Sequence, residues 1–139
     1  MEIILNKEIN STLENVSELV LLISESLKKI SVLSVVVDDI EIAVAEAMTN
    51  IVKHAYNSDE NKKIELNLTK SSDYIIIEIF DDAPEFKIDF NRELVYNPED
   101  IDTLPEGGMG IFLMNKCMTS IELKRVNNKN QLIMKKKYE

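Results

Sequence analysis

Three polar side chains at four-residue spacing are the first candidates for chemistry. Glu46, Asn50 and His54 advance only about 40° per step around a helix, so an acid, an amide and an imidazole share one face, with Lys53 beside them. Glu46 has apolar neighbours on both sides, where a carboxylate can act as a general base. The amide oxygen of Asn50 suits Mg²⁺, which also binds phosphate oxygens. The alternative explanation for the same residues is the solvated edge of an amphipathic helix.

A second candidate is Asp81, in the segment Asp81-Asp82-Ala83-Pro84 that follows the alternating apolar run 75–80. A carboxylate that leaves the end of a strand can accept a hydrogen bond from a ligand, such as the amino group of a base. A carboxylate at this position can equally be a turn former. The residues alone leave both interpretations open.

Glycine is scarce in this chain, and all of it lies in one place. About 7% glycine is ordinary, but the chain has three glycines, all within Gly107-Gly108-Met109-Gly110 at the start of an apolar run. Glycines allow a backbone to approach a ligand closely, and a helix N-terminus presents unpaired N–H groups with a partial positive charge. Together they predict an anion site of the kind that binds phosphate. The segment matches neither the Walker nor the Rossmann pattern.

Helices and strands must position these residues. Ser11-Thr12-Leu13-Glu14 is a capping-box pattern with Ser11 as the expected N-cap. Periodicity predicts helices over about 12–30, from Asp38-Asp39 to about Tyr56, and over 110–118. Alternation predicts a short edge strand at 2–5 and strands around 64–68, 74–80, 120–126 and 131–138, the last two joined by a turn at 127–130. The hairpins predict an α+β fold, a two-layer α/β sandwich with a mixed, mostly antiparallel sheet and its helices on one face.

The prolines and glycines also mark one long connection. Pro84, Pro98 and Pro105 all lie between the second hairpin and the glycine cluster. Loops of this length are uncommon in compact domains and are usually functional lids or disordered insertions. Because the glycines gather at one end of the segment, we expect a functional lid over about 84–106.

Composition narrows the classes of protein. The 139 residues are 45% apolar with a net charge of −9, which repels a nucleic-acid backbone. The single cysteine, Cys117, excludes an internal disulfide and is expected to be buried packing. There is no signal-peptide pattern, and no apolar run approaches the ~18 residues of a membrane span. We expect one cytoplasmic domain over 1–139, with no membrane contact and no direct nucleic-acid partner.

Taken in order, the three segments resemble the signature boxes of the GHKL (Bergerat-fold) ATPases. The chain is similar in particular to the bacterial anti-sigma-factor serine/threonine kinases, over nearly its whole length. Segment 46–56 is similar to the N box of that family, segment 81–86 stands where its first glycine box lies, and segment 107–114 closely matches its second glycine box.

The resemblance implies ATP and Mg²⁺ as cofactors and assigns roles to matching positions. Glu46 would take the proton from a substrate serine or threonine hydroxyl, Asn50 would coordinate the Mg²⁺ on the ATP phosphates, and Asp81 would receive the adenine amino group. The 84–106 segment would be the ATP lid. The expected ATP-binding residues are Asn50, Lys53, Asp81, Ala83, Gly108, Met109, Gly110 and Ile111.

The implied protein substrate is a small anti-sigma-factor antagonist, and the second implied partner is a sigma factor. Leu19 and Leu22, off the main apolar stripe of the first helix, are expected in the core, although a homodimer or a sigma-factor contact could use them. A homodimer is therefore a further expectation.

The sequence departs from the family pattern in two places. Ala83 and Glu85 replace glycines of the first glycine box, and Asn130-Gln131 replaces a Gly-Thr pair before the final strand. These departures support an alternative, an ATP-binding partner-switching module without kinase activity. A histidine-kinase catalytic fragment is the least favoured reading, because no dimerisation helix with a phospho-accepting histidine precedes the domain in this sequence.

Overall fold

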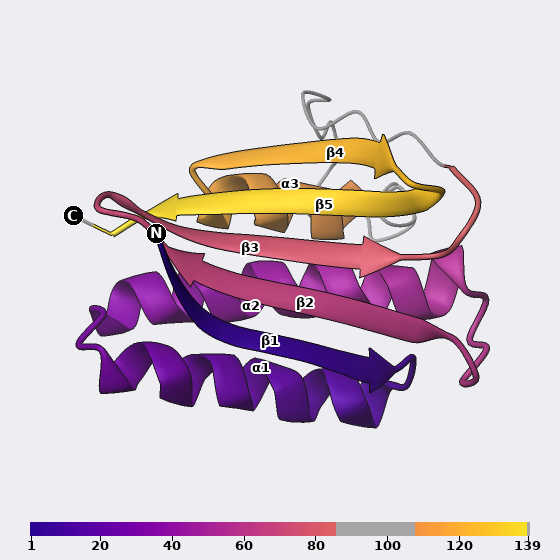
Figure 1. Ribbon diagram of the computed structural model, residues 1–139, viewed down its shortest axis with the longest axis horizontal. Helices are drawn as coiled ribbons and strands as arrows, with labels where there is room; N and C mark the ends of the chain where they lie inside the picture. The colour runs from indigo at the N-terminus through magenta and orange to yellow at the C-terminus, as the bar shows by residue number, and fades with distance from the viewer. Residues whose placement is uncertain (86–107, 139) are drawn as a thin grey trace, which may run out of the picture.

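The computed structural model describes residues 1–85 and 108–138 and shows a five-stranded sheet with helices on one side (Figure 1). The strand order is β1-β2-β3-β5-β4, so β1 and β4 form the edges. The strands are β1 (Glu2–Asn10), β2 (Lys63–Lys70), β3 (Tyr74–Asp81), β4 (Ser120–Val126) and β5 (Lys129–Lys137). The helices are α1 (Leu13–Lys29), α2 (Ser34–Asn50), the π-helical turn η1 (Ile51–Ala55) and α3 (Gly108–Cys117).

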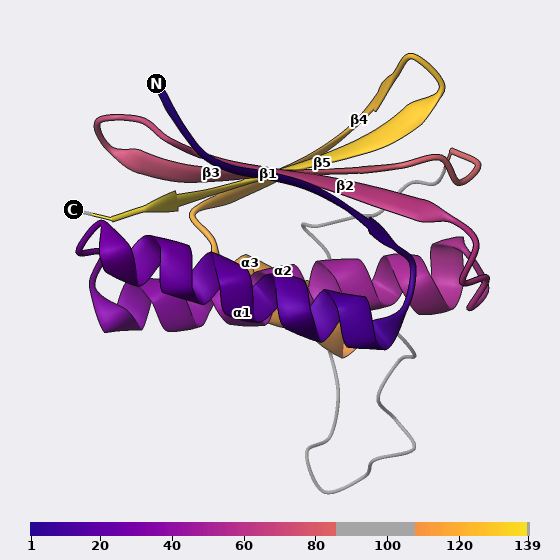
Figure 2. The same cartoon turned by 60° about the horizontal axis from the view of Figure 1, so that its bottom comes forward.

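The molecule has two layers, with the helices on one face of the sheet and the other face uncovered by any described helix (Figure 2). Alternate residues of the central strands point toward the helices and are fully buried, among them Leu66, Ile77 and Met134. They pack against apolar residues of α1 and α2 such as Ile23 and Ile40. This confirms the expected α+β two-layer sandwich, and every described strand pairing is antiparallel rather than mixed.

The strands agree with the alternation except at β1 and at the start of β5, where Lys129 and Asn130, expected in the turn 127–130, already pair with β4. The strand expected over residues 2–5 extends to Asn10, because β1 pairs with β2 along nearly its whole length. As an edge strand it tolerates polar side chains, so its second half lacks the alternation that would have revealed it. Asn127 and Asn128 at the β4–β5 turn both adopt positive φ, as a two-residue type I′ hairpin requires.

The first helix is capped one residue later than expected. The hydroxyl of Thr12 accepts a hydrogen bond from the Asn15 amide at 3.0 Å, and Thr12 has the extended backbone of an N-cap. The expected N-cap, Ser11, still belongs to the end of the sheet, because its N–H donates to the Lys62 carbonyl. The buried Ser11 hydroxyl has no hydrogen-bond partner among the described residues.

The second helix differs from the expectation at both ends. It begins at Ser34 rather than near Asp38, because burial of Val36 and Val37 outweighs the low helix propensity of valine. At its C-terminal end the α-helix gives way to the π-turn η1, in which the Tyr56 amide donates to the Ile51 carbonyl five residues earlier. The helix expected to run to about Tyr56 therefore changes its winding after Asn50.

The apolar pair of the first helix belongs to the core. Leu19 is 3% exposed and Leu22 packs partly buried against the core. The exposed large apolar residues of this helix are Leu13 and Leu21. Leu19 and Leu22 therefore serve core packing, as expected.

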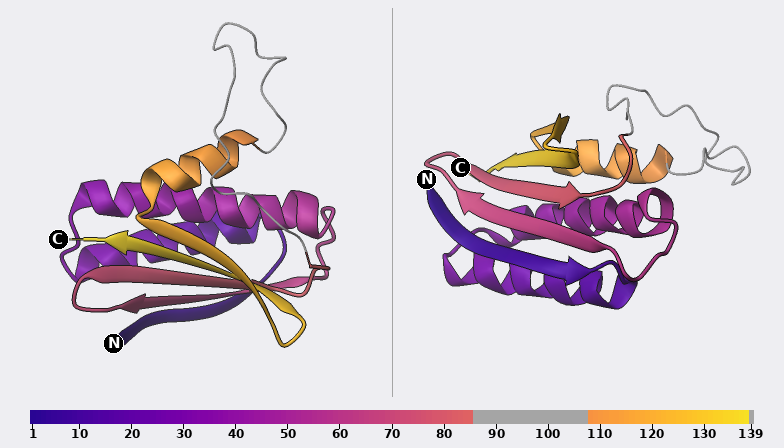
Figure 3. Two further views of the ribbon diagram at one scale, coloured as in Figure 1. Left: turned by 90° about the horizontal axis from the view of Figure 1, so that it is seen from above. Right: turned by 45° about the vertical axis from the view of Figure 1, so that its right-hand side comes forward.

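Helix α2 lies between α1 and α3, and α3 runs beside it near the β4–β5 edge of the sheet (Figure 3). Lys136 on β5 joins both helices to the sheet, because its ammonium donates to Asp39 Oδ2 at 2.8 Å and to the Cys117 carbonyl at 2.6 Å. Cys117 is buried as expected, and burial raises the pKa of its thiol. None of the described helices is long and apolar enough to cross a membrane.

The two neighbouring hydroxyls at the start of α1 provide a test of the helix cap. Thr12→Ala should lower the free energy of unfolding by about 1 kcal/mol, because the Asn15 amide loses its acceptor. Ser11→Ala should be neutral or stabilising, because the buried hydroxyl has no partner to lose. Urea unfolding of both variants checks this, and a larger loss for Ser11→Ala would restore Ser11 as the cap.

Candidate active site

Helix α3 brings Gly110 against the acid and the amide of α2. A β-carbon built on Gly110 would lie 2.8 Å from Glu46 Oε2, 3.5 Å from Asn50 Nδ2 and 3.8 Å from Asn50 Oδ1. The first distance is shorter than real side chains allow, so any residue other than glycine would displace the Glu46 carboxylate. Glycine at this position therefore allows the α3 backbone to reach the face of α2 that carries both polar groups.

Glu46 and Asn50 are both half-buried. Glu46 is thus less shielded from water than its apolar sequence neighbours suggest, because it lies on the face of α2 turned toward the start of α3 rather than toward the sheet. Within residues 1–85 and 108–138, neither side chain forms a hydrogen bond or an ion pair. The described structure therefore leaves an acceptor-only carboxylate and an amide beside a helix N-terminus, with their polar atoms uncommitted.

Lys53 and His54 do not join this group. Both are exposed on η1, and neither forms an ion pair with any residue that the structure describes. Of the expected stripe, Glu46 and Asn50 lie beside Gly110, whereas the exposed His54 lies on η1.

Asp81 lies at the end of β3 on the side of the sheet that faces the helices, and it is 3% exposed. Its Oδ1 accepts two hydrogen bonds of 2.9 Å, from the Ala83 amide and from Asn130 Nδ2. Burial raises the pKa of Asp81, as does the neighbouring Asp82 carboxylate; the two hydrogen bonds and the Arg125 guanidinium oppose that rise.

Sequence reasoning missed the partners of Asp81. Asn130 is 1% exposed and pairs directly with Asp81 across β5 and β3. Arg125 donates to Asn130 Oδ1 at 3.2 Å and to the Ala83 carbonyl at 2.8 Å. We call Asp81, Asn130 and Arg125 the strand-end network. The only sequence signal for it was the departure from the family pattern at Asn130, whose meaning depends on β5 lying next to β3.

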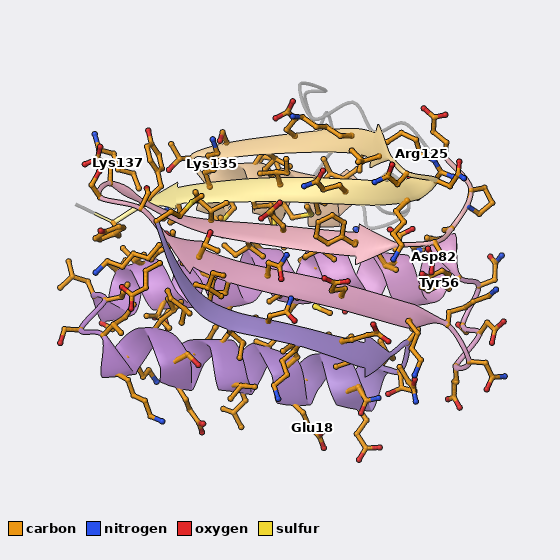
Figure 4. The ribbon with its side chains drawn as sticks, viewed as in Figure 1. Glu18, Tyr56, Asp82, Arg125, Lys135 and Lys137 are labelled. Carbon is orange, nitrogen blue, oxygen red and sulfur yellow. The ribbon has the colours of Figure 1, made fainter. Side chains whose placement is uncertain are left out.

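Tyr56 ties the end of the helical segment to the end of β3. Its hydroxyl donates to the Lys63 carbonyl and accepts from the Asp82 amide, both at 2.7 Å. The side chains of Tyr56, Asp82 and Arg125 gather at the end of the molecule where β3 finishes (Figure 4). The helix that carries Glu46 and Asn50 and the strand that carries Asp81 are thus fixed to each other.

The remaining expected ATP-binding residues are placed as follows. Ala83 is buried beside Asp81, Gly108 opens α3, Met109 follows it, and Ile111 is half-buried one residue after Gly110. Gly107 and residues 86–106 of the expected lid lie outside the described residues. Of the lid, the structure describes Pro84 and Glu85, which are exposed.

A metal ion would find few protein ligands here. In the described part of the chain no three His, Cys, Asp or Glu side chains gather to hold one. An amide oxygen beside a close backbone approach fits an ion that takes most of its ligands from water and phosphate, as Mg²⁺ does.

The contact between Gly110 and Glu46 can be measured as a double-mutant cycle of stability. In a Glu46→Ala background, Gly110→Ala should stabilise the protein by about 0.5–1 kcal/mol, the usual gain when alanine replaces glycine within a helix. In the wild-type background this gain should shrink or reverse, because the new β-carbon meets the carboxylate. Equal effects in both backgrounds, from urea unfolding, would mean that the carboxylate moves aside without cost and that this contact does not require glycine.

Removal of the Tyr56 hydroxyl should weaken the fold. Tyr56→Phe leaves the Asp82 amide and the Lys63 carbonyl without this partner and should cost about 1–3 kcal/mol of unfolding free energy. Tyr74→Phe is the control, because the Tyr74 hydroxyl bonds to no described residue and should cost little.

The Tyr56 hydroxyl also makes the unfolding free energy depend on pH. Burial raises the pKa of Tyr56 from 10.0 to about 12, so the unfolded chain loses this proton first. The stabilisation is therefore complete below pH 10 and is lost as the pH rises toward 12. The stability gap between wild type and Tyr56→Phe should narrow over that range, and a gap that stays constant would contradict the assignment.

Comparison with known proteins finds relatives of this chain. The chain is 34% identical over 105 residues to a protein named serine-protein kinase RsbW from Oceanobacillus iheyensis, an alignment that covers 73% of this chain and 65% of the relative. The RsbW kinases of Halalkalibacterium halodurans and Bacillus subtilis are 40% and 32% identical over 91 and 90 residues, 63% of this chain and 55% and 56% of theirs. The matched segment thus spans less than two thirds of each relative.

Solved structures share the fold at low identity. The crystal structure of the RsbU and RsbW domains of a Mycobacterium tuberculosis protein matches with a TM-score of 0.67 at 12% identity, over 96% of this chain and 31% of that one. The SiaB-SiaC complex from Pseudomonas aeruginosa matches with a TM-score of 0.63 at 11% identity, over 97% and 90%. The catalytic domain of the histidine kinase ThkA matches with a TM-score of 0.53 at 13% identity, over 99% and 98%.

These likenesses confirm the expected GHKL fold. The model of the histidine kinase-like ATPase domain matches residues 9–136, which include every described helix, the strands β2, β3 and β4, nearly all of β5 and each candidate site residue. The chain belongs to the family of histidine kinase-like ATPase domains.

Proposed function

We propose that this protein is an ATP-dependent serine/threonine kinase of the anti-sigma regulatory type. The observation that carries the proposal is the close approach of Gly110 to Glu46 and Asn50, because it joins an acceptor-only carboxylate, a metal-binding amide and a helix N-terminus in one place. The relatives named serine-protein kinase supply the reaction class.

Phosphoryl transfer needs positioning and charge stabilisation more than covalent work by the protein. Asn50 Oδ1 would hold Mg²⁺, which would neutralise charge on the phosphates. The N–H groups at the start of α3, around Gly108, Met109 and Gly110, would donate to phosphate oxygens. These local groups matter because the chain carries a net charge of −9 and its overall field disfavours an anion.

Glu46 is the group best suited to receive the proton from a substrate hydroxyl. Its carboxylate forms no hydrogen bond to any described residue, so it is available to an incoming serine or threonine. As that proton moves to Glu46, the hydroxyl oxygen bonds to the γ-phosphorus and the bond to the leaving ADP oxygen breaks.

The base of ATP would bind at the end of β3. Asp81 would accept from the adenine amino group, and the buried Ala83 would pack beside it. The exposed Lys53 is close in sequence to Asn50 and would take part only by moving its flexible side chain toward the phosphates.

The partners follow from the same proposal. The protein substrate would be a small anti-sigma-factor antagonist phosphorylated on serine or threonine, and the unphosphorylated antagonist would compete with a sigma factor for this protein. The fold shared with the SiaB-SiaC complex is compatible with the binding of a protein partner. The reaction would occur in the cytoplasm, where ATP is supplied. Leu19 and Leu22 give no support for a homodimer, because both pack in the core.

The direct test is transfer of labelled phosphate from ATP, with Mg²⁺, to purified antagonist proteins encoded in the same operon. Wild type should label serine or threonine, and Glu46→Gln should lower the rate by about 10²–10⁴-fold, the usual contribution of a general base. Binding of ADP, measured by calorimetry, should remain in the variant.

Glu41→Gln is the matched control, because Glu41 is a half-buried glutamate on the same helix that has no contact with Gly110. It should keep the wild-type rate. A Glu46→Gln variant that transfers phosphate as fast as wild type would exclude Glu46 as the base. Nucleotide binding without transfer to any antagonist would overturn the kinase proposal in favour of an ATP-binding partner-switching module.

A further inference from the structure

The strand-end network contains a buried side-chain amide, that of Asn130, whose oxygen and nitrogen both form hydrogen bonds. A simple turn would not need such an amide. Asn130 lies on the helix-facing side of β5, opposite Asp81, and its Nδ2 donates to Asp81 Oδ1 at 2.9 Å. Its Oδ1 accepts from Arg125 Nη1 at 3.2 Å. The first glycine-box segment is held by the same amide, because Nδ2 also lies 3.1 Å from the Ala83 carbonyl and 3.3 Å from the Pro84 carbonyl.

Arg125 decides which way the Asn130 amide points. A guanidinium can only donate, so the amide must turn its oxygen toward Arg125 and its NH₂ toward Asp81 and the two carbonyls. The reverse orientation would place N–H against N–H and oxygen against three acceptors. The donors and acceptors around Asn130 therefore determine which end of its amide is the oxygen and which is the nitrogen.

This orientation places two N–H donors on one oxygen of Asp81. Asn130 and the Ala83 amide both donate to Oδ1, and no described residue donates to Oδ2. Donors on a carboxylate stabilise its ionised form. The ionisable groups near Asp81 are Asp82, Arg125 and Tyr56, of which Arg125 favours ionisation and Asp82 opposes it.

The protonation state of Asp81 decides which base it can bind. An ionised carboxylate only accepts hydrogen bonds, so it matches the 6-amino group of adenine. A protonated carboxyl can donate to the 6-carbonyl oxygen of hypoxanthine or guanine. If Asp81 lost the donors that stabilise its ionised form, it would be protonated more readily. It would then discriminate poorly between these bases.

We propose that Asn130, oriented by Arg125, is a positioning residue that keeps Asp81 a fixed hydrogen-bond acceptor and so selects adenine over bases with a 6-carbonyl group. The inference rests on the proposed nucleotide function and adds to it the residue that sets base selectivity. It also gives a role to Asn130, one of the positions at which this chain departs from the pattern of its family.

The test compares the binding of ADP and of inosine diphosphate by calorimetry, because the two ligands share their phosphates and differ at position 6 of the base. Wild type should prefer ADP by about 10–100-fold, the range of a hydrogen bond to a charged group. Asn130→Leu removes the donor at similar volume and should reduce that preference by about tenfold. Asn130→Thr keeps a hydroxyl donor and should restore part of the preference.

The pH profile separates positioning from a loss of structure. The preference for ADP should decline as the pH falls through the pKa of Asp81, since the protonated carboxyl no longer excludes a carbonyl. Asn130→Leu should move this decline to higher pH, because the variant lacks one donor that lowers that pKa. A variant that only loosened the fold would weaken both ligands equally, and that result would overturn the proposal.

Two further variants complete the design. Gln131→Leu is the matched control, because Gln131 also donates from a β5 amide to a β3 carboxylate, Glu78 at 2.7 Å, but on the opposite face of the sheet. It should leave the preference unchanged. Arg125→Met removes an exposed guanidinium, is expected to fold, and should reduce the preference by a few-fold.

The outcomes distinguish this inference from the proposed function. Failure of wild type to bind either nucleotide would refute the nucleotide site itself. Tight binding of ADP with an unchanged preference in both Asn130→Leu and Arg125→Met would leave the nucleotide site intact and refute the role of Asn130.

Discussion

The close packing of α3 on α2 is the constraint on which the site depends. Two helices can bring polar groups together only where their backbones approach, and a residue without a side chain permits the shortest approach. Gly110 occupies that point, and its missing β-carbon leaves room for the Glu46 carboxylate. Lys136 supports the same packing from the sheet, because it bonds to the start of α2 and to the end of α3. The acid, the amide and the helix N-terminus lie together because of this one contact.

A second set of interactions holds the other half of the site in place. Tyr56 joins the end of η1 to the end of β3, and the strand-end network joins β3 to the β4–β5 hairpin. Most of these bonds are buried or half-buried, where an unpaired polar group is costly, so they define one arrangement of the backbone around Asp81. The phosphate end and the base end of the proposed site are thereby fixed relative to each other.

The sequence predicted the parts of this structure that depend on local periodicity. Alternation located β2 and β3, and the four-residue step correctly placed Glu46 and Asn50 on one face. The convergence of Asn50 and Gly110 was also predicted, but from a family resemblance that joined two segments 60 residues apart rather than from local pattern. The roles assigned to these residues stay predictions.

The errors have physical causes that no local pattern carries. Ser11 and Thr12 are both good caps, and the choice between them depends on where the chain leaves β2, which is a tertiary contact. The π-turn after Asn50 has no signature in residue type, so the sequence predicted an uninterrupted α-helix to about Tyr56. The role of Asn130 depends on the insertion of β5 between β3 and β4, since only that order places it opposite Asp81.

The most direct measurement of the central claim is paramagnetic broadening of ¹⁵N-labelled protein by Mn²⁺, used in place of Mg²⁺, in the presence and absence of ADP. If Glu46, Asn50 and Gly110 surround one metal-bearing nucleotide, the side-chain amide of Asn50 and the backbone amide of Gly110 should broaden first, and only when ADP is present. Broadening that spares both amides while it affects other parts of the protein, or that is the same without ADP, would contradict the account.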